Sequence, residues 1–193
     1  MEARIDSPAD GAVAGTVVVA HPHPLFGGSM DNKVVQTIAR AYVQCGWRAI
    51  RFNFRGVGLS AGIYDEGRGE ADDLMAVVHH SAASGALALA GFSFGSFVAS
   101  TAVQRLHGER ALSSLILVGT AVSRFPVTTL PSELHPKTLV IHGEADETVP
   151  LGDVLRWAQP QNLPVLVIPG ASHFFHGQLN VLRYLVARQI TAG

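Results

Sequence analysis

Short apolar runs alternate with longer amphipathic stretches along almost the whole chain. Most of the short runs lack a polar residue at every second position, which is typical of strands that helices cover on both faces. Their alternation with helical stretches predicts βαβ units and a mostly parallel sheet. The predicted strands comprise residues 16–20, 48–54, 86–90, 114–118, 138–142 and 165–168.

Between these strands, apolar positions recur at helical spacing. The clearest case lies near the end of the sequence, where Leu179, Leu182, Leu185 and Val186 share one helical face. Since no internal repeat or linker-like change in composition interrupts the pattern, we expect one domain, residues 1–193. Its expected architecture is a three-layer α/β/α sandwich with a sheet of about six to seven strands. The predicted helices comprise residues 30–44, 70–82, 94–107, 151–158 and 178–189, and residues 2–5 add an edge strand.

Composition narrows the classes of function. Hydrophobic residues make up 48% of the chain and charged residues 15%, which excludes intrinsic disorder. No apolar run approaches the roughly 18 residues of a membrane helix. A net charge of −1 indicates neither nucleic acid nor a membrane surface as a partner and favours small neutral ligands. The single Cys45 cannot form an intrachain disulfide, and the polar start with Glu2, Arg4 and Asp6 predicts a cytoplasmic protein.

The segment Gly91-Phe92-Ser93-Phe94-Gly95 matches the pattern G-x-S-x-G. In this pattern a sharp strand-to-helix turn raises a serine hydroxyl above the sheet, and flanking glycines avoid collisions with neighbouring backbone. The five-residue pattern alone is weak evidence. Here, however, an apolar strand precedes it and a helix-compatible stretch follows, so Ser93 is the predicted nucleophile. The alternative is a glycine-flanked turn in which Ser93 only caps the helix.

A serine hydroxyl needs a base, normally a histidine held by a carboxylate. Asp146 follows the predicted strand at 138–142, and His173 follows the last predicted strand, so the chain order is Ser, Asp, His. Glu144 and Glu147 are rivals of Asp146 by proximity. Asp146 could instead cap the next helix, and His173 could be a surface histidine. The other histidines are interpreted as structural, and no spacing of ligands predicts a metal site.

Acyl transfer also needs two N–H groups directed at the developing oxyanion. Phe94, directly after the nucleophile, is expected to supply one. The second should come from the loop after the strand at 16–20, where Pro22 and Pro24 have no N–H to donate. His23 and Leu25 remain, and His23 is favoured because the prolines on either side stiffen its backbone.

Taken together, the chain resembles the α/β-hydrolase superfamily over nearly its whole length, and most closely the compact lidless esterases. Residues 53–60 are similar to the family's Arg-Gly-x-Gly-x-Ser segment, and His142-Gly143-x-x-Asp146 is similar to its acid loop. The resemblance implies Ser93, Asp146 and His173 as a catalytic triad. The chain departs from lipases in having His-Pro-His-Pro-Leu where His-Gly-Gly-Gly would stand. It departs from dienelactone hydrolases in having serine where they carry cysteine.

The connection at residues 121–137 is too short for a lid of several helices, so the site should be open. Aromatic and apolar residues beside the proposed catalytic loops could line an acyl pocket, with ordinary core packing as the alternative. The predicted pocket residues are Phe26, Val149, Phe174 and Phe175.

These features favour a serine hydrolase that cleaves carboxylic esters or thioesters of small acyl groups through an acyl-enzyme, without a cofactor or metal. The expected partner is a small-molecule ester. Two alternatives remain open at this point: a small peptidase or amidase, and a noncatalytic α/β-hydrolase scaffold that acts as a binding module.

Overall fold

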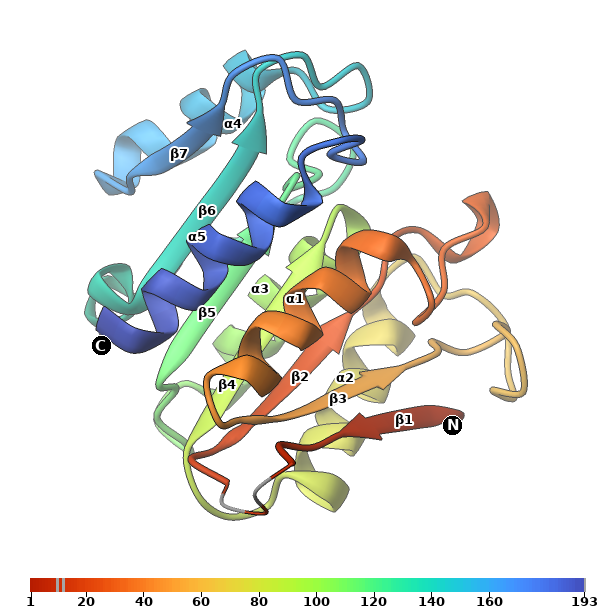
Figure 1. Ribbon diagram of the computed structural model, residues 1–193. Helices are drawn as coiled ribbons and strands as arrows, with labels where there is room; N and C mark the ends of the chain where they lie inside the picture. Colours follow the sequence, from red (N-terminus) through yellow and green to blue (C-terminus); the bar gives the residue numbers. More distant parts are fainter. Residues whose placement is uncertain (10, 12, 193) are drawn as a thin grey trace.

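The computed structural model describes residues 1–9, 11 and 13–192 (Figure 1). Within these residues, seven strands form one sheet in the order β1-β3-β2-β4-β5-β6-β7. β1 pairs with β3 in the antiparallel direction, and the other neighbours are parallel. The strands are β1 (Ala3–Asp6), β2 (Thr16–Ala20), β3 (Arg48–Phe52), β4 (Leu87–Phe92), β5 (Ser114–Val118), β6 (Thr138–Gly143) and β7 (Val165–Ile168).

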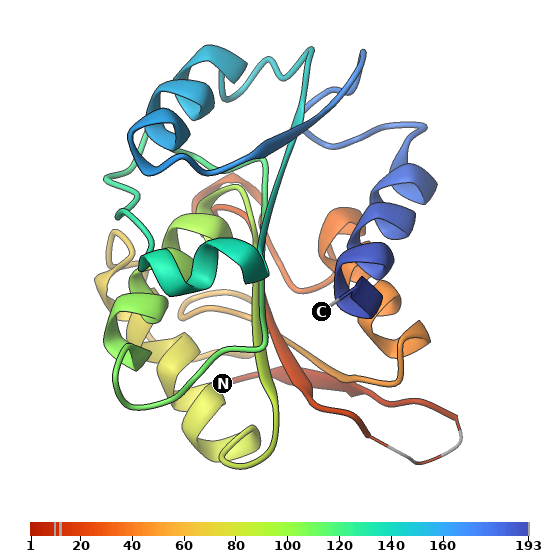
Figure 2. The same ribbon diagram turned by 90° about the vertical axis from the view of Figure 1, so that its left-hand side faces the viewer.

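Helices cover both faces of the sheet, which makes the predicted three-layer sandwich (Figure 2). α1 (Lys33–Gln44) and α5 (Leu179–Ala192) pack against each other on one face. The opposite face carries α2 (Arg68–Ser81), α3 (Phe94–Leu106) and α4 (Leu151–Ala158). Short 3-10 turns occur at Pro24–Phe26, Ser132–Lys137 and Gln159–Gln161. Among the described residues, no helix has the length and apolar character needed to cross a bilayer.

The central strand β2 explains why the sequence shows continuous apolar runs rather than an alternation of apolar and polar residues. All five of its residues are buried. Val17 and Val19 pack into the core beneath α1 and α5, whereas Val18 and Ala20 pack into the core beneath α2 and α3. Successive side chains of a strand point to opposite faces, so a strand that is covered twice must be apolar throughout.

Several boundaries differ from the prediction by one to three residues, and two of these differences lie beside buried polar groups. β3 ends at Phe52 rather than residue 54, although the N–H of Asn53 still donates to the Glu2 carbonyl at 2.9 Å. The Asn53 side-chain oxygen accepts the N–H of Met30 at 2.9 Å. α1 therefore begins at Lys33 instead of residue 30, after Asn32, which accepts the N–H of Val34.

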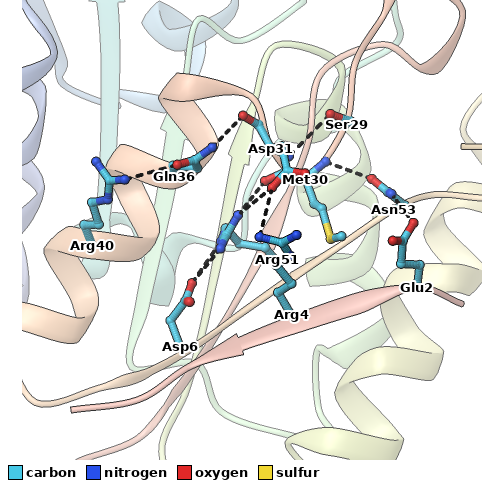
Figure 3. Close-up of polar contacts among 10 residues, drawn as sticks. All are labelled: Glu2, Arg4, Asp6, Ser29, Met30, Asp31, Gln36, Arg40, Arg51 and Asn53. Carbon is cyan, nitrogen blue, oxygen red and sulfur yellow. Dashed lines mark hydrogen bonds and ion pairs between the residues drawn. The ribbon is translucent and has the colours of Figure 1, made fainter. Parts of the chain in front are cut away.

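Arg51 ties the edge strand to the segment before α1 (Figure 3). Its guanidinium donates to Asp6 Oδ2 and to the Met30 carbonyl, each at 2.9 Å, and lies 3.4 Å from Asp31 Oδ1. The Arg51 side chain is only 8% exposed, so these contacts replace its hydration. The network fixes the chain directly after the loop that follows β2.

We expect Arg51→Met to lower the free energy of unfolding by about 2 kcal/mol, because a buried carbonyl and Asp6 lose their donor. Arg4 contacts the same Asp31 at 3.8 Å, but its side chain is 61% exposed. Arg4→Met should therefore change stability by less than about 0.5 kcal/mol. Urea denaturation of both variants checks the expectation, and equal losses would contradict the role of Arg51.

Candidate active site

Ser93 lies at the turn between β4 and α3. Its backbone has φ 56° and ψ −117°, a conformation that non-glycine residues rarely adopt. The Ser93 N–H donates to the Val118 carbonyl at 2.8 Å, which fixes the turn against β5. A Cβ at Gly91 would overlap the backbone of Gly95, and a Cβ at Gly95 would overlap that of Ala20. The turn therefore requires both glycines.

Ser93, His173 and Asp146 form one hydrogen-bonded chain. His173 Nε2 lies 3.0 Å from Ser93 Oγ, and His173 Nδ1 lies 2.7 Å from Asp146 Oδ2. All three residues are buried, with exposures of 8%, 2% and 8% respectively. An ionised carboxylate only accepts, so Nδ1 carries the proton and Nε2 presents its lone pair to the serine hydroxyl. Such an imidazole can take the serine proton.

Asp146 remains ionised despite its burial. Burial alone would raise its pKa, but hydrogen bonds from His173 and from the N–H groups of Val149 and Thr148 outweigh it and lower the pKa below its ordinary value. The two backbone N–H groups reach Asp146 Oδ1 at 2.8 and 2.9 Å, which leaves Oδ2 for the imidazole. Each carboxylate oxygen thus has its own donors.

The rival carboxylates contact the backbone near His173 rather than its ring. Glu144 Oε2 accepts the N–H of Gly170 at 2.9 Å, and Glu147 Oε2 accepts the N–H of His173 at 3.2 Å. Both glutamates therefore hold the loop that carries His173. Of the three acidic candidates, the structure brings only Asp146 to the imidazole.

His142, interpreted from sequence as structural, contacts the same acid loop. Its Nε2 lies 2.9 Å from the Val149 carbonyl and 3.4 Å from Asp146 Oδ2. The ring is fully buried, and burial lowers its pKa, which favours the neutral form. Within the described residues, Nδ1 has no hydrogen-bond partner. The spacing His-Gly-x-x-Asp directly after a strand is the signal that could have indicated this contact.

The loop after β2 leaves the N–H of His23 without a protein acceptor among the described residues. The N–H of Leu25, the other candidate, donates to His23 Nδ1 at 3.2 Å and is already used. Phe94 is the first residue of α3, so its N–H has no partner within the helix. Phe94 and His23 thus supply the free N–H groups beside Ser93.

His21 controls the peptide unit that carries the His23 N–H. Its Nδ1 lies 2.6 Å from the Pro22 carbonyl, and its Nε2 accepts the N–H of Phe54 at 3.0 Å. Burial lowers the pKa of His21 to about 4, partly opposed by the Pro22 contact, so the ring is neutral with its proton on Nδ1. In a trans peptide the carbonyl and N–H point in opposite directions. Holding the Pro22 carbonyl therefore orients the His23 N–H.

A cavity of about 370 Å³ opens beside Ser93 and His173. Of the predicted pocket residues, Phe26, Val149 and Phe174 line it. The prediction for Phe175 is wrong, because that side chain is fully buried in the core beneath α1 and α5. Phe175 has φ 53°, and this turn directs it into the core while Phe174 remains at the cavity.

Comparisons with known proteins identify relatives of this chain. No family model matches the chain. The uncharacterized protein RP471 of Rickettsia prowazekii is 32% identical over 174 residues, which cover 84% of this chain and 72% of that protein. The solved structure of XC6422 from Xanthomonas campestris, an α/β serine hydrolase without a lid, is 36% identical, with a TM-score of 0.87. The match covers 98% of this chain and 88% of the XC6422 chain. The chain belongs to the α/β-hydrolase family.

A second solved structure supports the assignment of this chain to the α/β-hydrolase family. An α/β serine hydrolase homologue from Coxiella burnetii is 38% identical, with a TM-score of 0.84. The match covers 97% of this chain and 90% of the homologue's chain. As in the lidless relative, the described residues form no cap over the site. Between β5 and β6 the hydrolase has only a loop and the 3-10 turn Ser132–Lys137. That connection supplies Arg124 and Phe125 to the cavity, which the sequence analysis missed. Their position after the carboxyl end of a strand is the signal that could have indicated them.

The low pKa of His21 predicts a pH dependence of stability. An unfolded histidine protonates near pH 6.5, whereas the folded ring protonates near pH 4. The unfolded state therefore binds more protons between these values, and the hydrolase should lose up to about 3 kcal/mol as the pH falls from 6.5 to 4. His21→Asn should remove this part of the pH dependence, measured by urea denaturation across that range. His80→Asn, an exposed change on α2, should leave the dependence as in the native hydrolase.

Proposed function

We propose that this hydrolase cleaves carboxylic esters or thioesters of small acyl groups through an acyl-enzyme. Ser93 is the nucleophile, His173 the general base and acid, and Asp146 the group that orients and stabilises the imidazole. The observation that carries the proposal is the hydrogen-bonded chain from Ser93 through His173 to Asp146 at an open cavity. A noncatalytic scaffold would have no need to keep this chain and its backbone donors together.

The reaction follows from the positions of the polar atoms. Ser93 Oγ attacks the ester carbonyl carbon while His173 Nε2 accepts the serine proton. The N–H groups of Phe94 and His23 stabilise the oxyanion of the tetrahedral intermediate. His173 then gives its proton to the leaving alcohol or thiol as the carbon–oxygen or carbon–sulfur bond breaks. Water attacks the acyl-enzyme, with His173 as base, and releases the acid and free Ser93.

The shape of the cavity supports a short acyl group. Phe26 is 83% exposed and Phe174 is 41% exposed, so the apolar walls are themselves open to solvent. Each methylene that is fully buried contributes only about 0.8 kcal/mol, and a shallow wall buries few of them. Cleavage of an ester also needs less stabilisation of the leaving group than cleavage of an amide, because an alkoxide leaves more readily than an amine anion.

The primary experiment is covalent labelling of Ser93 with a fluorophosphonate probe, together with a screen of neutral 4-nitrophenyl esters. We expect stoichiometric labelling, because only an activated hydroxyl attacks phosphorus quickly. Ser93→Ala should abolish labelling and turnover while the protein still folds. Ser123→Ala, at an exposed position outside the cavity, is the matched control and should label fully. Labelling that persists in Ser93→Ala would contradict the assignment of the nucleophile.

The acidic residues should separate by the magnitude of their effects. Asp146→Asn should lower kcat by about 10⁴, because the imidazole loses the acceptor that fixes its tautomer. Glu144→Gln and Glu147→Gln should lower kcat by less than about tenfold, because their amide oxygens can still accept the same backbone N–H groups. Steady-state kinetics with one 4-nitrophenyl ester compares the three variants. If Asp146→Asn lowered kcat only slightly while Glu144→Gln or Glu147→Gln lowered it by several orders of magnitude, the assignment of Asp146 as the acid would be wrong.

A further inference from the structure

Arg124 is the one permanently charged side chain on the described wall of the active-site cavity. It lies on the connection after β5, next to Phe125, and the same cavity contains Ser93 and His173. The rest of the wall consists of apolar, aromatic and neutral polar residues. A cation in such a place can act on a substrate during binding, because any ligand that fills the cavity must lie near it.

The guanidinium of Arg124 has no ion pair or hydrogen bond within the part of the chain that the structure describes. Other arginines of this region are already engaged: Arg55 with Asp73, Arg68 with Asp65 and Arg105 with Asp72. A guanidinium offers five N–H donors in a planar fork that matches a carboxylate or phosphate. Those donors remain available to a ligand.

A second hollow of about 560 Å³ adjoins the cavity, and Arg124 and Phe125 line both. Arg68 and Arg105 line the hollow as well. A molecule that reaches from Ser93 across Phe125 therefore passes Arg124 before it enters the hollow, where Arg68 and Arg105 already pair with acidic side chains. The combined space is larger than a small acyl group needs, and among the described residues on its wall Arg124 is the arginine without an ion pair.

Nearby acidic groups do not neutralise Arg124 by direct contact. Glu70 is fully buried, and its carboxylate accepts the N–H groups of Asp65 and Gly67. Glu66, on the wall of the hollow, pairs with Arg68 at 3.3 Å. The net charge of −1 favoured a neutral ligand, but the binding surface experiences the local arrangement of charges rather than the total.

We propose that Arg124 makes the hydrolase selective for esters or thioesters that carry an anionic group, a carboxylate or a phosphate, several bonds from the scissile carbonyl. This inference rests on the proposed ester hydrolysis at Ser93. The anion pairs with Arg124, and a bulkier remainder occupies the hollow lined by Arg68 and Arg105. Because the contact lies away from the reacting carbonyl, it contributes to binding and orientation and not to the chemical step itself.

The experiment compares esters that differ by one carboxylate. 4-Nitrophenyl butyrate is the neutral reference, 3-carboxy-4-nitrophenyl butyrate carries the anion on the leaving group, and mono-4-nitrophenyl adipate carries it on the acyl chain. The measured quantity is the ratio of kcat/KM for each anionic ester to that for the reference. Comparing the same ratio between protein variants cancels the intrinsic reactivity of the esters.

We expect Arg124→Gln to lower this ratio by about tenfold for at least one anionic ester, and Arg124→Glu to lower it further. The ester affected shows whether the anion belongs to the leaving group or to the acyl chain. Arg183 on α5 also has no ion pair within the described residues and lies outside both cavities. Arg183→Gln is therefore the matched control and should leave the ratio unchanged. Added salt should reduce the ratio in the native hydrolase more than in Arg124→Gln.

Ratios that stay within twofold of the native value in Arg124→Gln and Arg124→Glu, for both anionic esters, would overturn the inference. Failure of the proposed function would look different, since no ester would be cleaved by the native hydrolase. In that case the binding of the same three esters to Ser93→Ala, with and without Arg124→Gln, decides the matter by calorimetry. Tighter binding of an anionic ester that depends on Arg124 supports the inference, and binding independent of Arg124 contradicts it.

Discussion

The close approach of two backbone segments beside Ser93 is the constraint on which the rest of the site depends. A Cβ at Gly95 would overlap the carbonyl groups of Ala20 and His21, so the start of α3 lies directly against the end of β2. His23, Ser93 and Phe94 accordingly line one cavity. The strained φ of Ser93 is thus maintained by packing on both sides, from Gly91 and from Gly95.

A second close approach aligns the other half of the site. A Cβ at Gly143 would overlap the backbone at Ala171, so the loops that carry Asp146 and His173 touch without intervening side chains. The N–H groups of Gly170 and His173 donate to Glu144 and Glu147 on the loop of Asp146, which holds the two loops together. Two glycine-dependent contacts at the carboxyl ends of parallel strands therefore bring together groups 80 residues apart in sequence.

Much of this arrangement could be predicted from sequence because it is encoded locally. The apolar runs marked six strands, and the glycine-flanked serine, the His-Gly-x-x-Asp loop and His173 each follow one of them. What escaped prediction depends on contacts between distant segments. β3 ends early because Asn53 bonds to Met30, and Phe175 faces the core because its left-handed backbone reverses the direction expected beside Phe174. β1 pairs with β3 in the antiparallel direction at one edge of the sheet. The local sequence of β1 does not indicate which edge of the sheet it joins.

The connection after β5 combines anchored ends with a middle that faces the cavity. Near its far end, Thr128 and Thr129 bond to α3, and the Trp157 indole of α4 donates to the Val127 carbonyl. Between Ala121 and Val127 the backbone bonds mainly to itself, in the turns that carry Arg124 and Phe125. Ala121 and Phe125 of this part pack into the core beneath α2 and α3, and Phe125 stacks on Phe97. Arg124 is exposed and has no ion pair among the described residues. A change at Arg124 can therefore alter the substrate preference of the hydrolase at little cost in stability, whereas a change near Gly91, Gly95 or Gly143 cannot.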